Sequence, residues 1–558
     1  MNLQQATTVL RTGGELIVDV LEANGVERLY CVPGESYLAV LDALHDSSIR
    51  SIVCRQEGGA AMMADCEGRL TGRPGICFVT RGPGATNAAP GLHVAMQDSI
   101  PLILFVGQVA RKNREREGFQ ELDFRAVFGS LTKWTVEIDD AARIPELVTR
   151  AFSVALSGRP GPVVVALPED MLRDKVPAVP LRPAVTVETG PDEAALDRLE
   201  TILSEARAPV MVLGGTRWTE DAACAAHAIA EAWQLPVACS FRRQMLFDHL
   251  HPNYAGDAGI GQNPKLSARI RAADLVLLVG GRLSEMPSAG YTLLKSPFPD
   301  QRLVHVHADA GELGRVYQPA LAIHATPAVF ATAFARRKPA ADPDRSAAVG
   351  AAHRDYLDWS TPPETSPGAL HMGPIMTWLQ SALPDDAIIA NGAGNYSVWV
   401  HRYHRFRRFL TQAAPASGSM GYGTPAAVAA KAMFPQKTVI AFAGDGCFLM
   451  NGQEFATAVQ YNLPIIVIIV NNGMYGTIRM HQEREYPGRV SGTDLVNPDF
   501  AALATAYGGH GETVTETREF EAAFERCRAS GKPALIELHL HPEALTPTRT
   551  LSQIRGGG

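Results

Sequence analysis

The sequence predicts an α/β protein with three domains, each a parallel β-sheet flanked by helices. Two observations support this. Short apolar segments of strand length alternate with amphipathic segments of helix length along the 558 residues. Two proline-rich stretches, at 176–192 and 336–368, also divide the chain into segments of ordinary domain size. We therefore expect domains at 1–180, 190–340 and 365–558.

Buried strands explain the continuous apolar segments, because a strand covered by helices on both faces has no polar side. Such segments lie at 76–80, 102–106, 210–213, 275–279, 439–442 and 465–470. The first and third domains share an order of strand, glycine-rich turn, helix and second strand. This likeness has two interpretations: any two βαβ units look alike, or two related domains bind opposite ends of one ligand.

Composition and charge argue against a nucleic-acid-binding or membrane-spanning protein. The net charge of −7 is spread over a long chain, which predicts no basic surface for nucleic acid. The longest apolar runs, such as 464–470, are far shorter than the roughly 20 residues that span a bilayer. The 8 cysteines include no Cys-x-x-Cys pair, and no secretory signal pattern is visible. We expect a cytoplasmic protein with buried, reduced thiols and no membrane or nucleic-acid partner.

A motif in the third domain suits a diphosphate and a metal ion. Gly-Asp-Gly at 444–446 follows one expected strand, and Asn-Asn at 471–472 follows the next. Glycine lets a ligand approach the backbone, and a helix expected from about Met450 would direct N–H groups at a phosphate. Strand ends are also where ligands bind in such sheets. Asp445 and Asn472 offer the hard oxygen atoms that Mg²⁺ prefers.

This spacing resembles the motif of the thiamine-diphosphate (ThDP) enzymes. The resemblance implies ThDP and Mg²⁺ as cofactors, with Asp445, the Asn472 side chain and the Met474 carbonyl as metal ligands. Cys447 departs from the Ser or Ala common in the family. The other cofactor-site residues implied are Gly34, Gly394, Asn395, Tyr396, Gly418, Met420, Gly444, Gly446, Cys447, Tyr475, Gly476 and Thr477.

Met420 and the segment 391–396 have more specific assignments. Met420 corresponds to the large apolar residue that holds ThDP in its bent shape, although a methionine there could also be core filler. Residues 391–396 resemble the family's second diphosphate loop, in which Gln-His is common in place of Asn395-Tyr396.

The first domain is expected to supply the carboxylate that activates the cofactor. Glu57 begins a run of small residues, 57–64, that resembles the family motif around this carboxylate. Small neighbours leave a carboxylate poorly solvated, which raises its pKa. Without the other motifs, Glu57 would be interpreted as an exposed glutamate at a helix N-terminus. In the family the two halves of the site come from different subunits, which implies a homodimer or homotetramer with active sites at the subunit interface.

Nearly the whole chain resembles the acetolactate synthase branch of the ThDP enzymes. The similar pieces lie at 32–34, 81–87, 119–121, 132–134 and 157–163. One of them contains Gln120, a further candidate catalytic residue. The resemblance implies that the pyrimidine-binding, central and diphosphate-binding domains follow one another in that order.

Four positions depart from that branch. Glu35 stands where a small residue faces the reactive carbon of ThDP, and Met286 stands where an arginine holds the acceptor 2-oxo acid. Thr477 and His481 replace a methionine and a tryptophan of the substrate pocket. Loss of the arginine removes bidentate recognition of a carboxylate, so acetolactate synthesis from two pyruvates is not expected. Glu35 and His481 are either acid–base groups or a solvated turn and a surface helix residue.

The leading hypothesis is a ThDP- and Mg²⁺-dependent carbon–carbon lyase or carboligase acting on a 2-oxo acid or related carbonyl compound. The alternatives are a catalytically silent or regulatory ThDP-fold binding protein, and a 2-hydroxyacyl or oxalyl thioester lyase of the same family. A dinucleotide-dependent oxidoreductase is disfavoured because the turns at 212–215 and 280–282 lack the Gly-x-Gly-x-x-Gly fingerprint. FAD, which some relatives keep, is not expected, because an acidic pattern near Met286 is missing.

Overall fold

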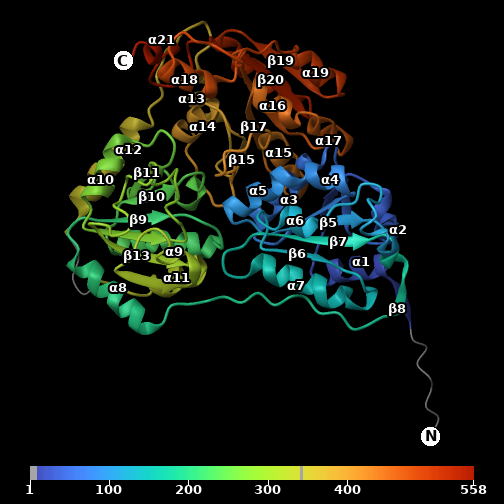
Figure 1. The fold of residues 1–558 in the computed structure, drawn as a ribbon. Helices are drawn as coiled ribbons and strands as arrows, with labels where there is room; N and C mark the ends of the chain where they lie inside the picture. Colours follow the sequence, from blue (N-terminus) through green and yellow to red (C-terminus); the bar gives the residue numbers. More distant parts are fainter. Residues whose placement is uncertain (1–8, 340–343, 558) are drawn as a thin grey trace. The chain divides into compact units, whose positions relative to one another are not determined.

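The computed structural model describes residues 9–339 and 344–557. The chain forms two compact units, Met1–Val187 and Glu188–Gly558. The first unit contains one six-stranded sheet and the second contains two (Figure 1). All strands in these three sheets are parallel to their neighbours. The prediction of an α/β protein with three parallel sheets flanked by helices is confirmed.

The sheet of the first unit has the strand order β3-β2-β4-β5-β7-β6. Its central strands are buried along their whole length, as the apolar segments predict. A short antiparallel pair, β1 with β8, lies apart from this sheet. The strands are β1 (Leu10–Thr12), β2 (Arg28–Cys31), β3 (Arg50–Val53), β4 (Gly75–Val79), β5 (Leu102–Gln108), β6 (Trp134–Glu137), β7 (Pro162–Pro168) and β8 (Lys175–Pro177).

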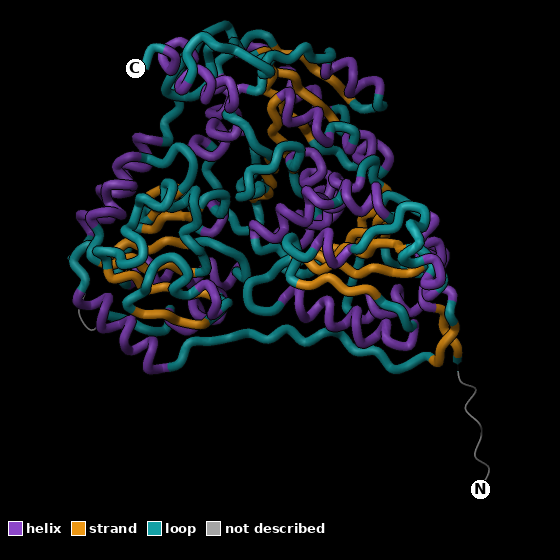
Figure 2. Tube along the Cα trace, in the orientation of Figure 1, coloured by secondary structure: helices purple, strands orange, loops and turns teal. Residues whose placement is uncertain are grey.

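Helices lie on both faces of this sheet (Figure 2). They are α1 (Gly13–Ala23), α2 (Leu38–His45), α3 (Glu57–Thr71), α4 (Gly82–Asn87), α5 (Ala89–Asp98), α6 (Phe124–Phe128) and α7 (Ile144–Leu156). Helices α3 and α5 pack very closely, and a Cβ atom on Gly91 would lie 2.4 Å from the Cβ of Ala61. The small residues of α3 therefore have a packing role as well as a place in the motif.

The second unit contains a central sheet and a C-terminal sheet. The central sheet has the order β11-β10-β9-β12-β13-β14, and the C-terminal sheet has the order β16-β15-β17-β18-β20-β19. The central strands are β9 (Pro209–Leu213), β10 (Val237–Ser240), β11 (Tyr254–Ala258), β12 (Leu275–Val279), β13 (Arg302–His307) and β14 (Leu321–His324). The C-terminal strands are β15 (Ile388–Asn391), β16 (Gln412–Ala413), β17 (Val439–Gly444), β18 (Ile466–Asn471), β19 (His510–Val514) and β20 (Ala534–His539).

Among residues 188–339 and 344–557, fourteen α-helices accompany these two sheets. They are α8 (Glu193–Glu205), α9 (Glu220–Ala232), α10 (Pro264–Ala272), α11 (Pro327–Phe334), α12 (Ser346–Trp359), α13 (Met372–Ala382), α14 (Tyr396–Tyr403), α15 (Gly423–Met433), α16 (Asp445–Asn451), α17 (Glu454–Gln460), α18 (Gly476–Glu485), α19 (Phe500–Ala506), α20 (Phe520–Ala529) and α21 (Leu551–Arg555). Within the two described ranges, no helix is long and apolar enough to span a membrane.

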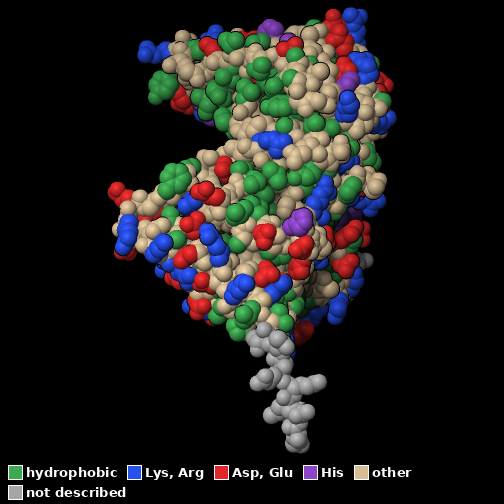
Figure 3. All heavy atoms as spheres, turned by 90° about the vertical axis from the view of Figure 1, so that its right-hand side faces the viewer, with side chains coloured by type: hydrophobic (Ala, Val, Ile, Leu, Met, Phe, Trp, Pro, Cys, Tyr) green, Lys and Arg blue, Asp and Glu red, His purple; other side chains and the backbone are tan. Residues whose placement is uncertain are grey.

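Two properties of the surface bear on the expectations from composition. Seven cysteines are buried, but Cys224 is exposed on α9, which corrects the expectation that all the thiols are buried. On the face drawn in Figure 3, positive and negative side chains are interspersed among the described residues, without an extended patch of one sign.

Candidate functional site

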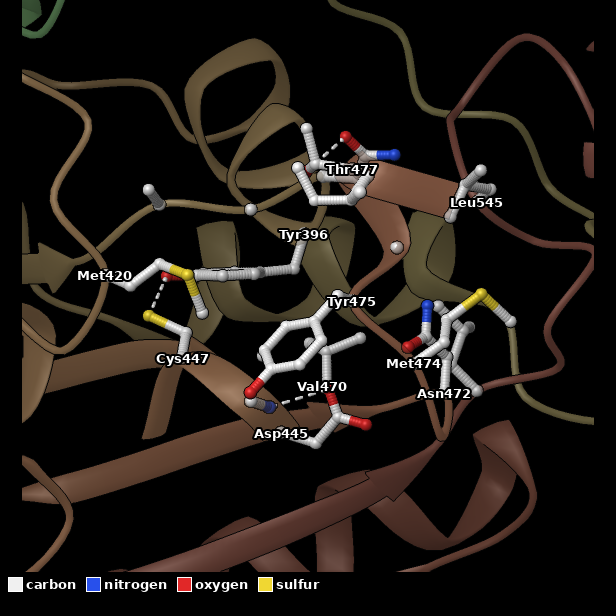
Figure 4. Close-up of a pocket in the computed structure, with 18 of the residues that line it drawn as sticks. Tyr396, Met420, Asp445, Cys447, Val470, Asn472, Met474, Tyr475, Thr477 and Leu545 are labelled. Atoms are coloured by element: carbon white, nitrogen blue, oxygen red, sulfur yellow. Dashed lines mark hydrogen bonds between the residues drawn. The ribbon is translucent and has the colours of Figure 1, made fainter. Parts of the chain in front are cut away.

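A cavity of about 240 Å³ lies in the second unit, where β15, β17 and β18 end (Figure 4). This is the edge of a parallel sheet at which ligands bind. Every cofactor-site residue predicted between 394 and 477 lines this cavity: Gly394, Asn395, Tyr396, Gly418, Met420, Gly444, Asp445, Gly446, Cys447, Asn472, Met474, Tyr475, Gly476 and Thr477. The remaining lining residues were not predicted: Ala393, Trp399, Val470, Ile478, Leu540 and Leu545.

The Gly-Asp-Gly turn joins β17 directly to α16. Helix α16 begins at Asp445, so the expectation of a helix start near Met450 was wrong. Asp445 is buried, which raises the pKa of its carboxyl group. The carboxylate accepts hydrogen bonds from the Gly446 and Gly473 backbone N–H groups, both at 2.9 Å. The acidic side chain is therefore held firmly at the cavity wall.

Aromatic rings lie close to both glycines of this turn. A Cβ atom on Gly446 would lie 2.5 Å from the ring of Tyr475, and one on Gly444 would lie 3.1 Å from the ring of Tyr396. Any larger residue at 446 would displace the Tyr475 ring. The turn is thus a bare backbone surface beside a helix N-terminus, which suits a diphosphate.

Two departures from the ThDP-enzyme pattern, Tyr396 and Cys447, are in direct contact. The Tyr396 hydroxyl lies 3.4 Å from the Cys447 Sγ (Figure 4). It also accepts a hydrogen bond from the Gly392 N–H at 3.0 Å. The Gly421 N–H in turn donates to the Cys447 Sγ at 3.3 Å. Burial raises the pKa of Tyr396, so its hydroxyl stays protonated. The pair thereby connects the loops after β15 and before α15.

The Asn-Asn pair follows β18, on the neighbouring strand end. Asn472 and Met474 line the cavity, whereas Asn471 points to other protein groups. The Asn471 Oδ1 accepts from the Gly473 N–H at 3.1 Å, and its Nδ2 donates to Glu537 at 2.7 Å. The two asparagines therefore have different surroundings, and only Asn472 has its side chain at the cavity.

Asn497 is a residue of this site that the sequence reasoning missed. Its Nδ2 donates to the Asp445 Oδ2 at 2.8 Å and to the Asn471 Oδ1 at 2.9 Å. In the sequence it precedes Pro498 in a segment without strand or helix periodicity, which indicates only a turn. No local signal distinguishes it from other turn asparagines.

The donor set at this strand edge suits Mg²⁺. In the parts of the chain that the structure describes, no group of three or more His, Cys, Asp or Glu could hold a metal ion. A cation here would use the single carboxylate of Asp445 together with amide and carbonyl oxygens. Mg²⁺ is commonly bound in this way, through one or two carboxylates plus the phosphates of a ligand.

The far wall of the cavity comes from α18 and the C-terminal segment. Thr477 donates from its hydroxyl to the Asn395 Oδ1 at 2.9 Å, which connects two predicted residues. His481 does not line the cavity: it is exposed on α18, and its Nδ1 lies 2.8 Å from the Arg484 Nη2. Within one chain, His481 therefore contacts another residue of its own helix, and both interpretations of this residue remain open.

In the first unit, Glu57 is the first residue of α3 and is half-buried. The Asn87 side-chain amide donates to the Glu57 Oε2 at 3.0 Å. A Cβ atom on Gly84 would lie 3.2 Å from the Glu57 Oε1, so α4 passes close to the carboxylate. Both ends of the Glu57 carboxylate are therefore bounded by α4.

Glu35 lies near the same sheet edge, in a short 3₁₀ helix, Glu35–Tyr37. Its side chain is 71% exposed and forms an ion pair with Arg81, whose side chain is only 6% exposed. The preceding Gly34 has no room for a side chain, since a Cβ atom would lie 2.5 Å from the Cβ of Thr80. The Gln120 backbone carbonyl accepts a hydrogen bond from the Gly82 N–H at 3.0 Å, which holds the 120 loop against the start of α4.

Comparison with known protein families gives three matches along the chain. The N-terminal TPP binding domain, the central domain and the C-terminal TPP binding domain of thiamine pyrophosphate enzymes match residues 11–127, 196–334 and 392–538. The large subunit of acetolactate synthase isozyme 2 of Escherichia coli is 30% identical over 95% of both chains. Acetolactate synthase of Bacillus subtilis is 29% identical over 96% of this chain and 94% of its own.

Proposed function

Because the chain belongs to the thiamine pyrophosphate enzymes of the acetolactate synthase family, we propose that it is a Mg²⁺-dependent carboligase or lyase for carbonyl substrates other than a pair of pyruvates. The observation that carries the proposal is the single cavity around which fourteen motif residues gather. When bound, ThDP supplies a nucleophilic carbon that adds to a carbonyl group and accommodates the resulting negative charge.

The cavity residues divide into three roles in this proposal. Asp445, Asn472 and the Met474 carbonyl would hold Mg²⁺ against the diphosphate. The backbone of Gly446 and Cys447 would bind the diphosphate oxygens, since Gly446 leaves the main chain open to a ligand and both residues lie in the first turn of α16. Met420 and Tyr396 would support the middle of the cofactor from the side of the cavity that they share.

Glu57 is proposed to exchange a proton with the aminopyrimidine ring of the cofactor. The Asn87 amide donates to the Glu57 Oε2 and so orients the carboxylate. Among the described residues, the Glu57 Oε1 accepts no hydrogen bond. Removing a positioned acid–base group of this kind typically costs about 10²–10⁴-fold in turnover.

The substrate part of the proposal rests on charge. By the family resemblance, Met286 stands at the position that would bind the acceptor carboxylate. In the first unit, the Arg81 guanidinium is already paired with Glu35. Arg81 also lies 3.9 Å from Glu169, so one cation serves two carboxylates. The lack of an arginine at position 286 and the presence of Glu35 each disfavour a second anionic 2-oxo acid, which leaves a neutral carbonyl acceptor as the favoured substrate.

The cofactor assignment is tested with purified protein. ThDP with Mg²⁺ should raise the melting temperature, and Glu57→Gln should keep the dissociation constant of ThDP while losing about 10²–10⁴-fold in turnover. Glu27→Gln, an exposed change in the same unit, is the matched control. Absence of ThDP binding by the wild type would refute the function, whereas full activity of Glu57→Gln would refute only the role of Glu57.

The substrate assignment is tested by product analysis. The wild type is incubated with a panel of 2-oxo acid donors, each with and without neutral aldehyde acceptors. We expect products from a 2-oxo acid alone or with an aldehyde, and little acetolactate from pyruvate. Acetolactate formed from pyruvate faster than any other product would overturn this part of the proposal.

A further inference from the structure

Asn497 joins the two loops that carry the proposed metal ligands. Its amide nitrogen donates to Asp445 after β17 and to Asn471 after β18. The Gly473 N–H donates to the same two acceptors, at 2.9 Å and 3.1 Å. The Leu495 N–H donates to the Gly473 carbonyl at 2.8 Å, which holds the segment before Asn497 against the second loop. These bonds form a closed network between two strand ends.

The network is fixed from behind by a buried carboxylate, Glu537 on β20. Its Oε1 accepts from the Asn471 Nδ2 at 2.7 Å, and its Oε2 accepts from the Phe500 N–H at 3.2 Å. Phe500 begins α19 three residues after Asn497. Glu537 therefore holds both Asn471 and the segment that presents Asn497.

We propose that Asn497 is a positioning residue for the metal and the diphosphate, a proposal that rests on the proposed function of this cavity. Asn497 and Gly473 together use the Oδ2 atom of Asp445, which fixes the rotation of the carboxylate about its terminal bond. The other oxygen, Oδ1, accepts from the Gly446 N–H at 2.9 Å and keeps its second lone pair in a defined direction for a cation. Partners of this kind, which orient a ligand without touching the metal, typically contribute about 10–100-fold to metal affinity.

A second observation concerns the other end of the same side chain. The Asn497 Oδ1 is buried and has no hydrogen-bond partner among residues 9–339 and 344–557. Buried amide oxygens are nearly always paired in folded proteins, so an unpaired one beside a predicted ligand site needs an explanation. A water molecule of the hydrated cation is a donor of the required kind.

The proposal is tested by titrating Mg²⁺ into protein saturated with ThDP, with isothermal calorimetry as the readout. Asn497→Ala should raise the dissociation constant of Mg²⁺ by about 10–100-fold. Asn497→Asp keeps the shape but replaces the donor by an acceptor facing Asp445, and it should weaken binding at least as much. Val496→Ala, at the exposed neighbouring position, should leave the dissociation constant unchanged.

Activity separates positioning from a general structural defect. In the alanine variant, turnover at saturating Mg²⁺ should return to near the wild-type value, while the Mg²⁺ concentration for half-maximal activity rises. The circular dichroism of both variants without cofactor checks that they fold. A dissociation constant for Asn497→Ala within about threefold of the wild type would overturn the proposal. If the wild type itself binds neither ThDP nor Mg²⁺, the proposed function fails together with this inference.

Discussion

Asp257, at the end of edge strand β11, provides a test of the energetics of the central domain. Its Oδ1 is buried and unpaired within the described part of the chain, and burial raises the pKa of the carboxyl group to about 7. The Arg242 guanidinium opposes this rise only in part. Replacing Asp257 by asparagine removes the titration while preserving the shape of the side chain.

The sign of the effect follows from the two pKa values. In the unfolded chain the carboxyl group titrates near 3.8, so between that pH and about 7 the folded state binds the proton more tightly. The stability contributed by this group is therefore complete below about pH 4 and is lost as the pH rises through 7. Between pH 5 and pH 8 the loss amounts to about 2.5 kcal/mol.

Hydrogen exchange of peptides covering β10 and β11 measures this change, because it reports local opening free energies in a chain too large for two-state unfolding. Wild type and Asp257→Asn are compared at pH 5 and at pH 8, so that any effect independent of pH cancels. We expect the variant to gain about 2.5 kcal/mol on the wild type between the two values. A gain below about 0.5 kcal/mol would refute a buried, proton-binding Asp257.

Two further changes probe a loop at the cavity and the attachment of the C-terminal helix α21. Tyr396→Phe leaves the buried Gly392 N–H without its described acceptor, a cost of about 1–3 kcal/mol. Calorimetry should therefore show ThDP binding weakened by roughly 5–150-fold. Equal affinity would show that this bond does not order the loop. Arg555→Met removes hydrogen bonds of 2.7 and 2.8 Å to Glu483, which lower the pKa of that carboxyl group to about 2. Hydrogen exchange of 543–555 at pH 7 should accelerate in this variant, and unchanged exchange would mean that apolar packing alone holds α21.

The six strands named from the sequence were placed within a residue or two, because a buried parallel strand is apolar throughout its length. The expected strand 275–279 coincides with β12, and 102–106 falls inside β5. The start of α16 was misplaced because Gly and Asp are weak helix formers, and the first turn of a helix needs no apolar periodicity. Helix N-termini at ligand turns are therefore poorly marked in a sequence.

The gathering of the motif residues around one cavity followed from topology, since most of them come directly after a strand of one parallel sheet and Gly418 and Met420 lie in the loop between β16 and α15. Asn497 lay beyond this reasoning because its position depends on a long connection between β18 and β19. The ion pair of Arg81 with Glu35 could not be predicted from the sequence either, because the two residues lie 46 positions apart. Contacts of this kind depend on packing between elements, which local patterns do not encode.

The short helix α4 has a mechanical consequence for the first unit. Arg81, which immediately precedes it, is paired with Glu35, and Asn87, its last residue, is bonded to Glu57. At about 1.5 Å per residue the helix is roughly 9 Å long, and one carboxylate is bonded at each end. A displacement of α4 would therefore move Glu35 and Glu57 together. A mutation that shifts this helix would change substrate selection and cofactor activation at the same time.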